Sequence, residues 1–227
     1  ALVQRGSERS EAIRIGWLRR AIGLREWDLE HDGEHRYFLI EDRRTLAVLL
    51  VRSGDRAGAE SLLRRNLEPM SRMTELNDYL LATNTLDLAA WLLLDGRLVE
   101  MEQLLAAPPL PTRKTTLAPL LDLYASGADE LRAWGYIQRR EFEPARPLLQ
   151  RQAEAGRVQA GLDLIHVCEH LGETSCSEGW LAKLRQQTAR LTRIDHLIHS
   201  PFAYDRLGNG WEMPWLEPRR QILARLR

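Results

Sequence analysis

The chain has 227 residues and a mass of 26.2 kDa, which is enough for one large domain or two small ones with a sizeable core. Its thirty-two basic residues balance thirty-two acidic ones, so there is no net field to collect nucleic acid, and the balance of hydrophobic and charged residues excludes a disordered chain. The longest apolar runs, such as 46–51 and 88–94, are far shorter than the roughly 20 residues of a membrane-spanning helix.

The N-terminus indicates that the sequence is part of a longer protein. It begins with Ala1, and the following letters LVQRGS differ by one residue from a common protease-site linker. We therefore expect residues 1–10 to be a remnant of a linker and residues 11–227 to form one helical domain. The first helix is expected over 11–30, where apolar residues recur at helical spacing, and His31-Asp32-Gly33 ends it.

Apolar residues recur at three and four along most of the chain, a period that predicts an all-α protein without strands. Four pairs of such stripes predict four helical hairpins, near residues 40–68, 83–106, 128–155 and 160–190. Each pair is interrupted by a short break, which is typical of a tight turn between two helices. The breaks fall at Gly54-Asp55, Asp95-Gly96, Arg140-Glu141 and Gly172.

The first three hairpins repeat one pattern. Their segments read AVLLVRSGDRAGAESLL, AAWLLLDGRLVEMEQLL and AWGYIQRREFEPARPLL, and the matched small positions are 42 and then 44 residues apart. These positions are Ala47, Ala89 and Ala133 in the first helices and Ala59, Met101 and Ala145 in the second.

This pattern resembles the tetratricopeptide repeat family, in which small residues let the two helices of a repeat approach closely. The resemblance covers roughly residues 40–190 and implies an α-solenoid of antiparallel hairpins. Met101 departs from the family's second-helix alanine, and the spacing exceeds the usual 34 residues. A HEAT-like assignment, whose repeats have about this length, therefore stays open.

Two segments interrupt the repeats. Four prolines between Ala106 and Leu121 predict an extended crossover, followed by a short helix near 119–124. Residues 195–227 are expected to form an irregular, aromatic-rich cap on the last hairpin, ending in a helix over 218–227 with proline in its first turn. The aromatic residues of this cap are Phe202, Tyr204, Trp211 and Trp215.

Candidate catalytic and metal sites are few. The string His166-Val167-Cys168-Glu169-His170 matches the inverted zinc motif, in which two histidines bind the metal and the glutamate activates water. Ordinary hairpin residues explain this string better, since that family resides in much larger domains. His31-Asp32-Gly33-Glu34-His35 lies at a predicted helix end, where polar residues are common. Asp195, His196 and His199 are expected to make polar contacts with the aromatic C-terminal cap, with metal binding or pH sensing as the alternative. We expect no catalytic residue, no metal and no cofactor.

The two cysteines, Cys168 and Cys176, lie eight residues apart on either side of the turn at Gly172. Antiparallel helices bring such positions close together, so a disulfide across the fourth hairpin is expected if the Cα atoms come within about 7 Å. A disulfide would indicate an oxidising compartment such as the periplasm. Two free thiols in a cytoplasmic protein remain the alternative.

A tetratricopeptide-like solenoid implies a concave groove, built from the first helices, that receives a partner peptide, a partner helix or a small effector. We expect the outward-facing positions of these helices to bind such a partner. They are Arg44, Val48, Arg52, Ala90, Leu94, Glu130, Trp134 and Gln138.

The last helix, with the sequence EPRRQILARL, is similar to that of the sensor regions of membrane-anchored winged-helix bacterial regulators. This resemblance implies a non-enzymatic sensing or interaction module outside the cytoplasm. A cytoplasmic scaffold is the alternative, and a zinc hydrolase acting through HVCEH is the third hypothesis.

Overall fold

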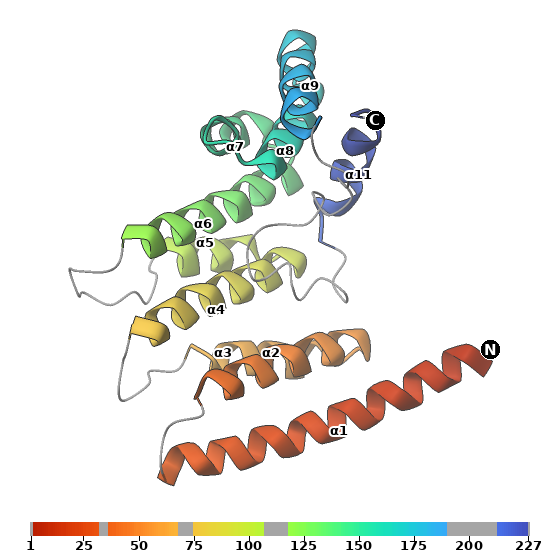
Figure 1. Ribbon diagram of the computed structural model, residues 1–227, viewed down its shortest axis with the longest axis vertical. Coiled ribbons are helices and arrows are strands. Elements are labelled where there is room, and N and C mark those ends of the chain that lie inside the picture. Colours follow the sequence, from red (N-terminus) through yellow and green to blue (C-terminus); the bar gives the residue numbers. More distant parts are fainter. Residues whose placement is uncertain (1, 32–35, 68–74, 107–117, 190–212, 227) are drawn as a thin grey trace.

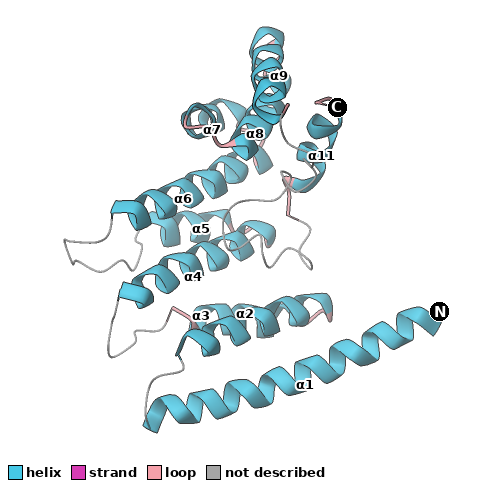
Figure 2. Cartoon of the chain, in the orientation of Figure 1, coloured by secondary structure: helices cyan, strands magenta, loops and turns pink. Residues whose placement is uncertain are grey.

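The computed structural model of the chain describes residues 2–31, 36–67, 75–106, 118–189 and 213–226. Within these ranges the chain forms ten α-helices and no strand (Figure 1, Figure 2). The all-α class predicted from the sequence is confirmed. The helices are α1 (Leu2–His31), α2 (Arg36–Arg52), α3 (Arg56–Arg65), α4 (Glu75–Leu94), α5 (Leu98–Ala106), α6 (Ala118–Gln138), α7 (Phe142–Glu154), α8 (Val158–His170), α9 (Thr174–Thr188) and α11 (Leu216–Ala224).

Successive helices pack against one another along the chain. The pairs α2–α3, α4–α5, α6–α7 and α8–α9 are the four expected hairpins, and α1 packs on α2. Neighbouring hairpins are joined by contacts of α3 with α4, α4 with α6 and α7 with α8. In Figure 1 the helices follow in chain order from α1 at one end to α9 at the other. This sequential packing is compatible with a helical repeat.

The six matched positions of the repeat have the environment that the pattern predicts. All six residues have no exposed surface, Met101 included. The methionine is accommodated by a glycine on the next hairpin, because a Cβ atom added to Gly135 of α6 would lie 3.0 Å from Met101 Cε. A larger residue in one helix is thus matched by a smaller one in its neighbour.

Several helices begin earlier than expected; α4, for example, starts at Glu75 instead of near residue 83. α1 starts at Leu2, nine residues before the predicted start, because residues 2–10 are mostly good helix formers without a proline. α6 is one continuous helix from Ala118, so the separate short helix near 119–124 is wrong. Pro119 occupies the first turn of α6, where its missing N–H costs no hydrogen bond. Residues 107–117 of the predicted crossover lie outside the described residues.

The C-terminal helix α11 packs against α8, with Met213, Trp215 and Leu216 buried at its start. Pro218 stands in its first turn, as expected. The remaining aromatic residues of the predicted cap, Phe202, Tyr204 and Trp211, lie outside the described residues.

Five helices end in the same turn. At the end of α2 the amide of Gly54 donates to Val51 O and the amide of Asp55 donates to Leu50 O, at 3.0 and 2.8 Å. This pair of bonds is the Schellman motif, and it requires a left-handed residue. Glycine supplies that residue in four of the turns, whereas Arg140, with φ of 59°, supplies it after α6. The four glycines are Gly54, Gly96, Gly156 and Gly172.

The Arg140 turn carries a penalty that the glycine turns avoid, because a Cβ atom is disfavoured in the left-handed region. We expect Arg140→Gly to raise the free energy of unfolding by about 0.5–1 kcal/mol, measured by urea denaturation. Arg140→Ala is the matched control, since it removes the long side chain but keeps the Cβ. Equal stabilisation by both variants would contradict a backbone origin.

Candidate functional site

The predicted groove positions are less accessible than expected. Arg44, Ala90, Glu130 and Trp134 are buried, so the expectation that they face outward is wrong. Val48 and Leu94 are half-buried, whereas Arg52 and Gln138 are exposed. The structure does not test whether any of the eight binds a partner, so that role stays a prediction. Arg44, Glu130 and Trp134 are buried because they belong to clusters of charged and aromatic side chains between neighbouring helices.

The first buried contact joins α2 to α4. Arg44 Nε lies 2.5 Å from Asp87 Oδ2, and Arg44 Nη1 donates to Glu41 Oε1 at 2.6 Å. Asp87 has no exposed surface, and burial raises its pKa to about 6 although Arg44 acts in the opposite direction. A cationic partner offsets the free-energy cost of removing the Asp87 carboxylate from water, which explains why Arg44 points inward.

The second buried contact joins three helices around Arg219 of α11. Its Nε donates to Asp163 Oδ1 at 2.7 Å, and its Nη2 lies 2.5 Å from both Asp163 Oδ2 and Glu130 Oε1. Trp134 Nε1 also donates to Asp163 Oδ2, at 3.2 Å. Arg219 and Asp163 are fully buried, and burial raises the pKa of Asp163 despite the adjacent cation. Glu130 and Trp134 therefore face the interior because they belong to this cluster.

The sequence reasoning missed Arg219 and Asp163. Asp163 is the one acidic residue within the apolar run Ala160–Val167, and a charge at such a position is a signal of a buried partner. The partner itself could not be found from spacing, because Arg219 lies 56 residues further along the chain.

Removal of Arg219 would leave two carboxylates buried without their cation. We expect Arg219→Met to lower the free energy of unfolding by about 3–5 kcal/mol, because breaking a buried ion pair strands its charges. Arg220→Met is the matched control: Arg220 is the adjacent arginine, is exposed, and makes an ion pair of 3.6 Å with Glu217 that should contribute little. Similar losses in both variants, measured by thermal and urea unfolding, would contradict this assignment.

Cys168 and Cys176 meet across the fourth hairpin. Cys168 is near the end of α8 and fully buried, and Cys176 is near the start of α9 and half-buried. Their Cα atoms are 5.9 Å apart and their sulfur atoms lie at disulfide distance, so the predicted proximity is confirmed. A carboxylate oxygen of Glu173 lies within 4.8 Å of both sulfur atoms. Among the described residues, these three side chains form the group that could hold a metal ion if the thiols were reduced.

The HVCEH string lies on α8 among aromatic residues. The rings of His166 and His170 are 4.4 Å apart between centroids, His166 stacks on Trp134, and Phe142 contacts both imidazoles. Burial, followed by the neighbouring His170, lowers the pKa of His166 to about 4, so it is neutral near pH 7. The Glu169 carboxylate accepts a hydrogen bond from Arg225, which directly follows α11.

Among the described residues, the potential metal-ligand groups of three or more do not include the histidines of HVCEH. The other two histidine-containing strings are those at 31–35 and 195–199. Residues 32–35 and the positions of Asp195, His196 and His199 lie outside the described residues.

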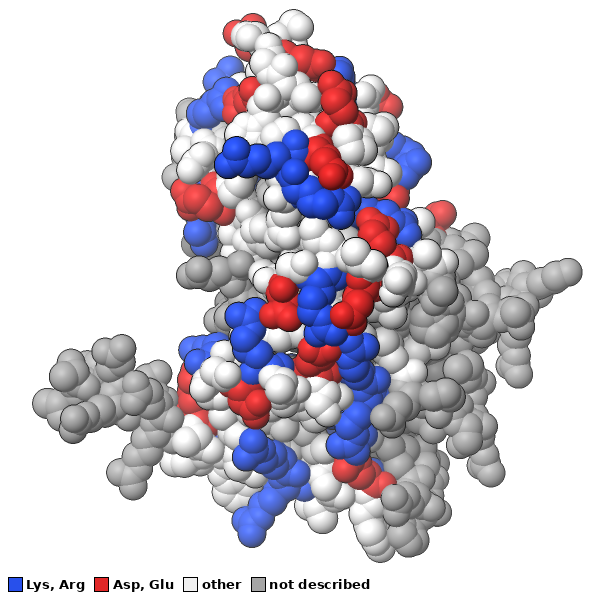
Figure 3. Space-filling model, turned by 180° about the vertical axis from the view of Figure 1, so that it is seen from behind, with Lys and Arg blue, Asp and Glu red and all other residues white. Residues whose placement is uncertain are grey.

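The second helices present a surface of mixed charge. Arg97 bonds Glu60 and Glu100 at 2.6 Å each, which links α3 to α5, and Arg64 bonds the same two carboxylates. Figure 3 shows acidic and basic side chains interleaved over this side of the molecule. Such interleaving gives no broad area of one sign on this face.

A different surface, on α1, combines exposure with large apolar side chains. Ile13, Trp17, Leu24 and Trp27 of α1 are 53%, 67%, 71% and 61% exposed, and Phe38 of α2 is 51% exposed. We call these five residues the α1 surface. The helical spacing of the apolar residues over 11–30 predicted the helix but did not separate its two sides.

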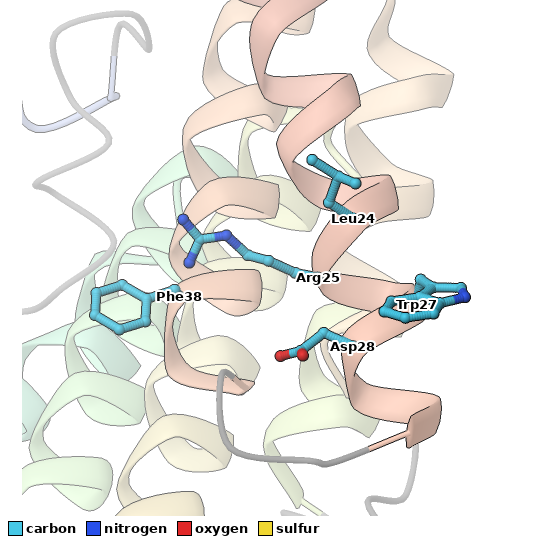
Figure 4. A pocket seen from close by; sticks show the side chains of 5 residues that line it. All are labelled: Leu24, Arg25, Trp27, Asp28 and Phe38. Carbon is cyan, nitrogen blue, oxygen red and sulfur yellow. The ribbon is translucent and has the colours of Figure 1, made fainter.

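At one end of the α1 surface an open pocket of about 480 Å³ is lined by Leu24, Arg25, Trp27, Asp28 and Phe38 (Figure 4). Trp27 and Phe38 stand on either side of it, on different helices. The Arg25 guanidinium lies 5.0 Å from the centre of the Phe38 ring and bonds Asp42 at 2.9 Å. These contacts fix the pocket wall, while its apolar side chains stay accessible.

The opposite side of α1 holds the helix on α2. Ile22 is buried there, and Glu26 accepts hydrogen bonds from Arg43 and Arg65 at 2.8 and 2.7 Å. Arg52 bonds Glu11 at 2.6 Å further along. The helix is thus held on α2 and α3 between residues 11 and 26, the part that carries most of the α1 surface.

No protein-family model, curated protein or solved structure matches this chain. Among the described residues, no helix combines the length and the apolar character that a membrane span requires.

Proposed function

We propose that the protein is a non-enzymatic protein-interaction module of the tetratricopeptide-like type, and that it is the sensor part of a larger bacterial signalling or regulatory protein. Four helical hairpins, fully buried small residues at the matched positions and a repeated turn support the tetratricopeptide-like assignment. The observation that carries the binding role is the α1 surface with its pocket.

Large exposed apolar surface is uncommon in proteins that bind nothing. A large aromatic side chain has an area of about 150–250 Å², so the α1 surface leaves on the order of 600 Å² of apolar area exposed. That is the upper end of the largest patch on an ordinary monomer, and such patches mark interaction sites. Tryptophan beside a pocket is also the composition of binding hot spots.

The groove of the first helices is the second candidate surface for a peptide or a small effector. Of its eight predicted positions only Arg52 and Gln138 are exposed, and four are buried. The α1 surface therefore fits a protein partner better.

Site-specific photo-cross-linking tests the binding role. A benzophenone amino acid replaces Leu24 in the α1 surface, and in the control it replaces Val99 of α5, which is also exposed, at 72%. We expect a discrete protein adduct from position 24 in cells that produce the full-length protein, and none from position 99, because only the first lies in an apolar patch. Equal labelling at both positions, or none at position 24, would contradict the proposal.

We place the module outside the cytoplasm because the cysteine pair is positioned for a disulfide. A cytoplasmic scaffold with reduced thiols is the alternative. The two locations differ in the chemistry of Cys168 and Cys176, which can be measured directly.

In protein exported to an oxidising compartment, we expect both cysteines to resist alkylation under denaturing conditions and the intact mass to be lower by two hydrogens. Closing a loop of this length stabilises the fold by about 2–3 kcal/mol, so reduction should lower the free energy of unfolding by that amount. The double substitution Cys168→Ser with Cys176→Ser is the control and should not respond to reductant. Full alkylation of exported protein would favour the cytoplasmic scaffold.

A further inference from the structure

We infer that the partner of the α1 surface is a second copy of this chain, bound through α1 in an antiparallel helix pair. This inference rests on the proposed function, because it assumes that the α1 surface binds protein. Its support comes from the spacing of the exposed residues, from the area that they present, and from the glycines and charges beside them.

The exposed residues of α1 follow a heptad pattern. Ile13, Trp17, Leu24 and Trp27 are separated by intervals of 4, 7 and 3, which are the intervals of the a and d positions of a coiled coil. Arg20 occupies the d position between Trp17 and Leu24. This pattern describes a narrow seam that fits another helix, and it continues over about two heptads.

The seam lies opposite the side that packs within the chain. Ile15, Leu18 and Ile22 face the core, whereas the residues of the seam point away from it. α1 therefore has apolar residues on two opposite sides, and packing on α2 uses one of them. A helix with two apolar sides normally has a neighbour on each.

The area of the α1 surface suits a pair of identical chains. About 600 Å² from each copy would bury roughly 1,200 Å² in total, which is the lower limit for a specific protein interface. A two-fold axis places the same patch on both chains, so the two patches are necessarily equal in size. Trp27 and Phe38, which line the pocket, would lie at each end of the pair and contribute to the buried area there.

Two glycines border the seam and are not explained by contacts within the chain. Gly16 and Gly23 lie one heptad apart inside α1, and a Cβ atom at either would meet nothing within 4 Å. Glycine inside a helix costs about 0.8–1 kcal/mol relative to alanine. A second helix lying against this edge would approach more closely because both positions lack side chains.

The charges on the other edge of the seam select the orientation. Arg14 and Asp28 lie on this edge, two heptads apart. An antiparallel pair centred near residue 21 brings Arg14 of each copy beside Asp28 of the other. A parallel pair would instead set each charge level with its identical counterpart. Arg20 falls near the centre, where its guanidinium can reach solvent or stack on Trp17 of the other copy.

Sedimentation equilibrium over an approximately hundredfold range of concentration tests the pair, since a dimer dissociates on dilution. We expect the wild-type chain to approach twice its mass of 26.2 kDa. Trp17→Glu should weaken the dimer by at least about thirtyfold, because it places a charge in the seam. Val99→Glu, at an equally exposed position on α5, should leave it unchanged. Circular dichroism verifies that both variants stay folded.

Cysteine cross-linking tests the orientation. Arg20→Cys lies near the centre of an antiparallel pair and should form a covalent dimer with itself. Ile13→Cys lies toward one end and should not, because its counterpart is then at the opposite end. Cross-linking at both positions would overturn the antiparallel arrangement.

The photo-cross-linking at position 24 separates the two claims. An adduct of twice the mass of the full-length protein, together with a wild-type dimer, supports the inference. An adduct of any other mass with a monomeric chain overturns the inference but keeps the proposed function. A monomeric chain without an adduct overturns both.

Discussion

The close approach of neighbouring helices is the constraint on which this fold depends. Ala47 and Ala59 in the first hairpin, like Ala133 and Ala145 in the third, have no exposed surface, so no space exists there for a longer side chain. The short turns enforce the same approach, because their two crossed hydrogen bonds leave few residues between antiparallel helices. In the second hairpin Met101 fills the place of an alanine, and Gly135 on α6 provides the room. Close packing is thus maintained when a larger residue in one helix faces a smaller one in its neighbour, so individual residues can differ between repeats.

The buried ion pairs act at a different level, between hairpins. Arg44 with Asp87 connects α2 to α4, and Arg219 connects α11 to α6 and α8 through Glu130 and Asp163. Buried ion pairs add little net stability compared with apolar contacts, since removing charge from water is costly. They do penalise any arrangement that separates the partners. They therefore determine which helices are neighbours and how each is positioned along its axis relative to the next. The apolar contacts supply the stability.

The helices and turns could be predicted from the sequence far better than the solvent exposure of their side chains. Helical periodicity and the breaks at Gly54, Gly96 and Gly172 are local signals, and all of them located real hairpins. Accessibility is not local. Trp134 was predicted to face a groove, but its indole N–H donates to Asp163, 29 residues away. The side of a helix that is covered depends on elements distant in the sequence, and periodicity does not describe those elements.

The apolar residues of α1 are a second case in which periodicity does not predict exposure. A list of apolar residues in helical order cannot distinguish Ile22, which is buried, from Trp17, which is two-thirds exposed, until the position of α2 is known. Once the inner side is assigned, the remaining apolar residues form a heptad seam on a helix fixed by ion pairs to α2 and α3. Packing on α2 requires apolar residues on the inner side of α1 only. The regular spacing of the outer apolar residues is the observation on which the proposed pairing with another helix rests.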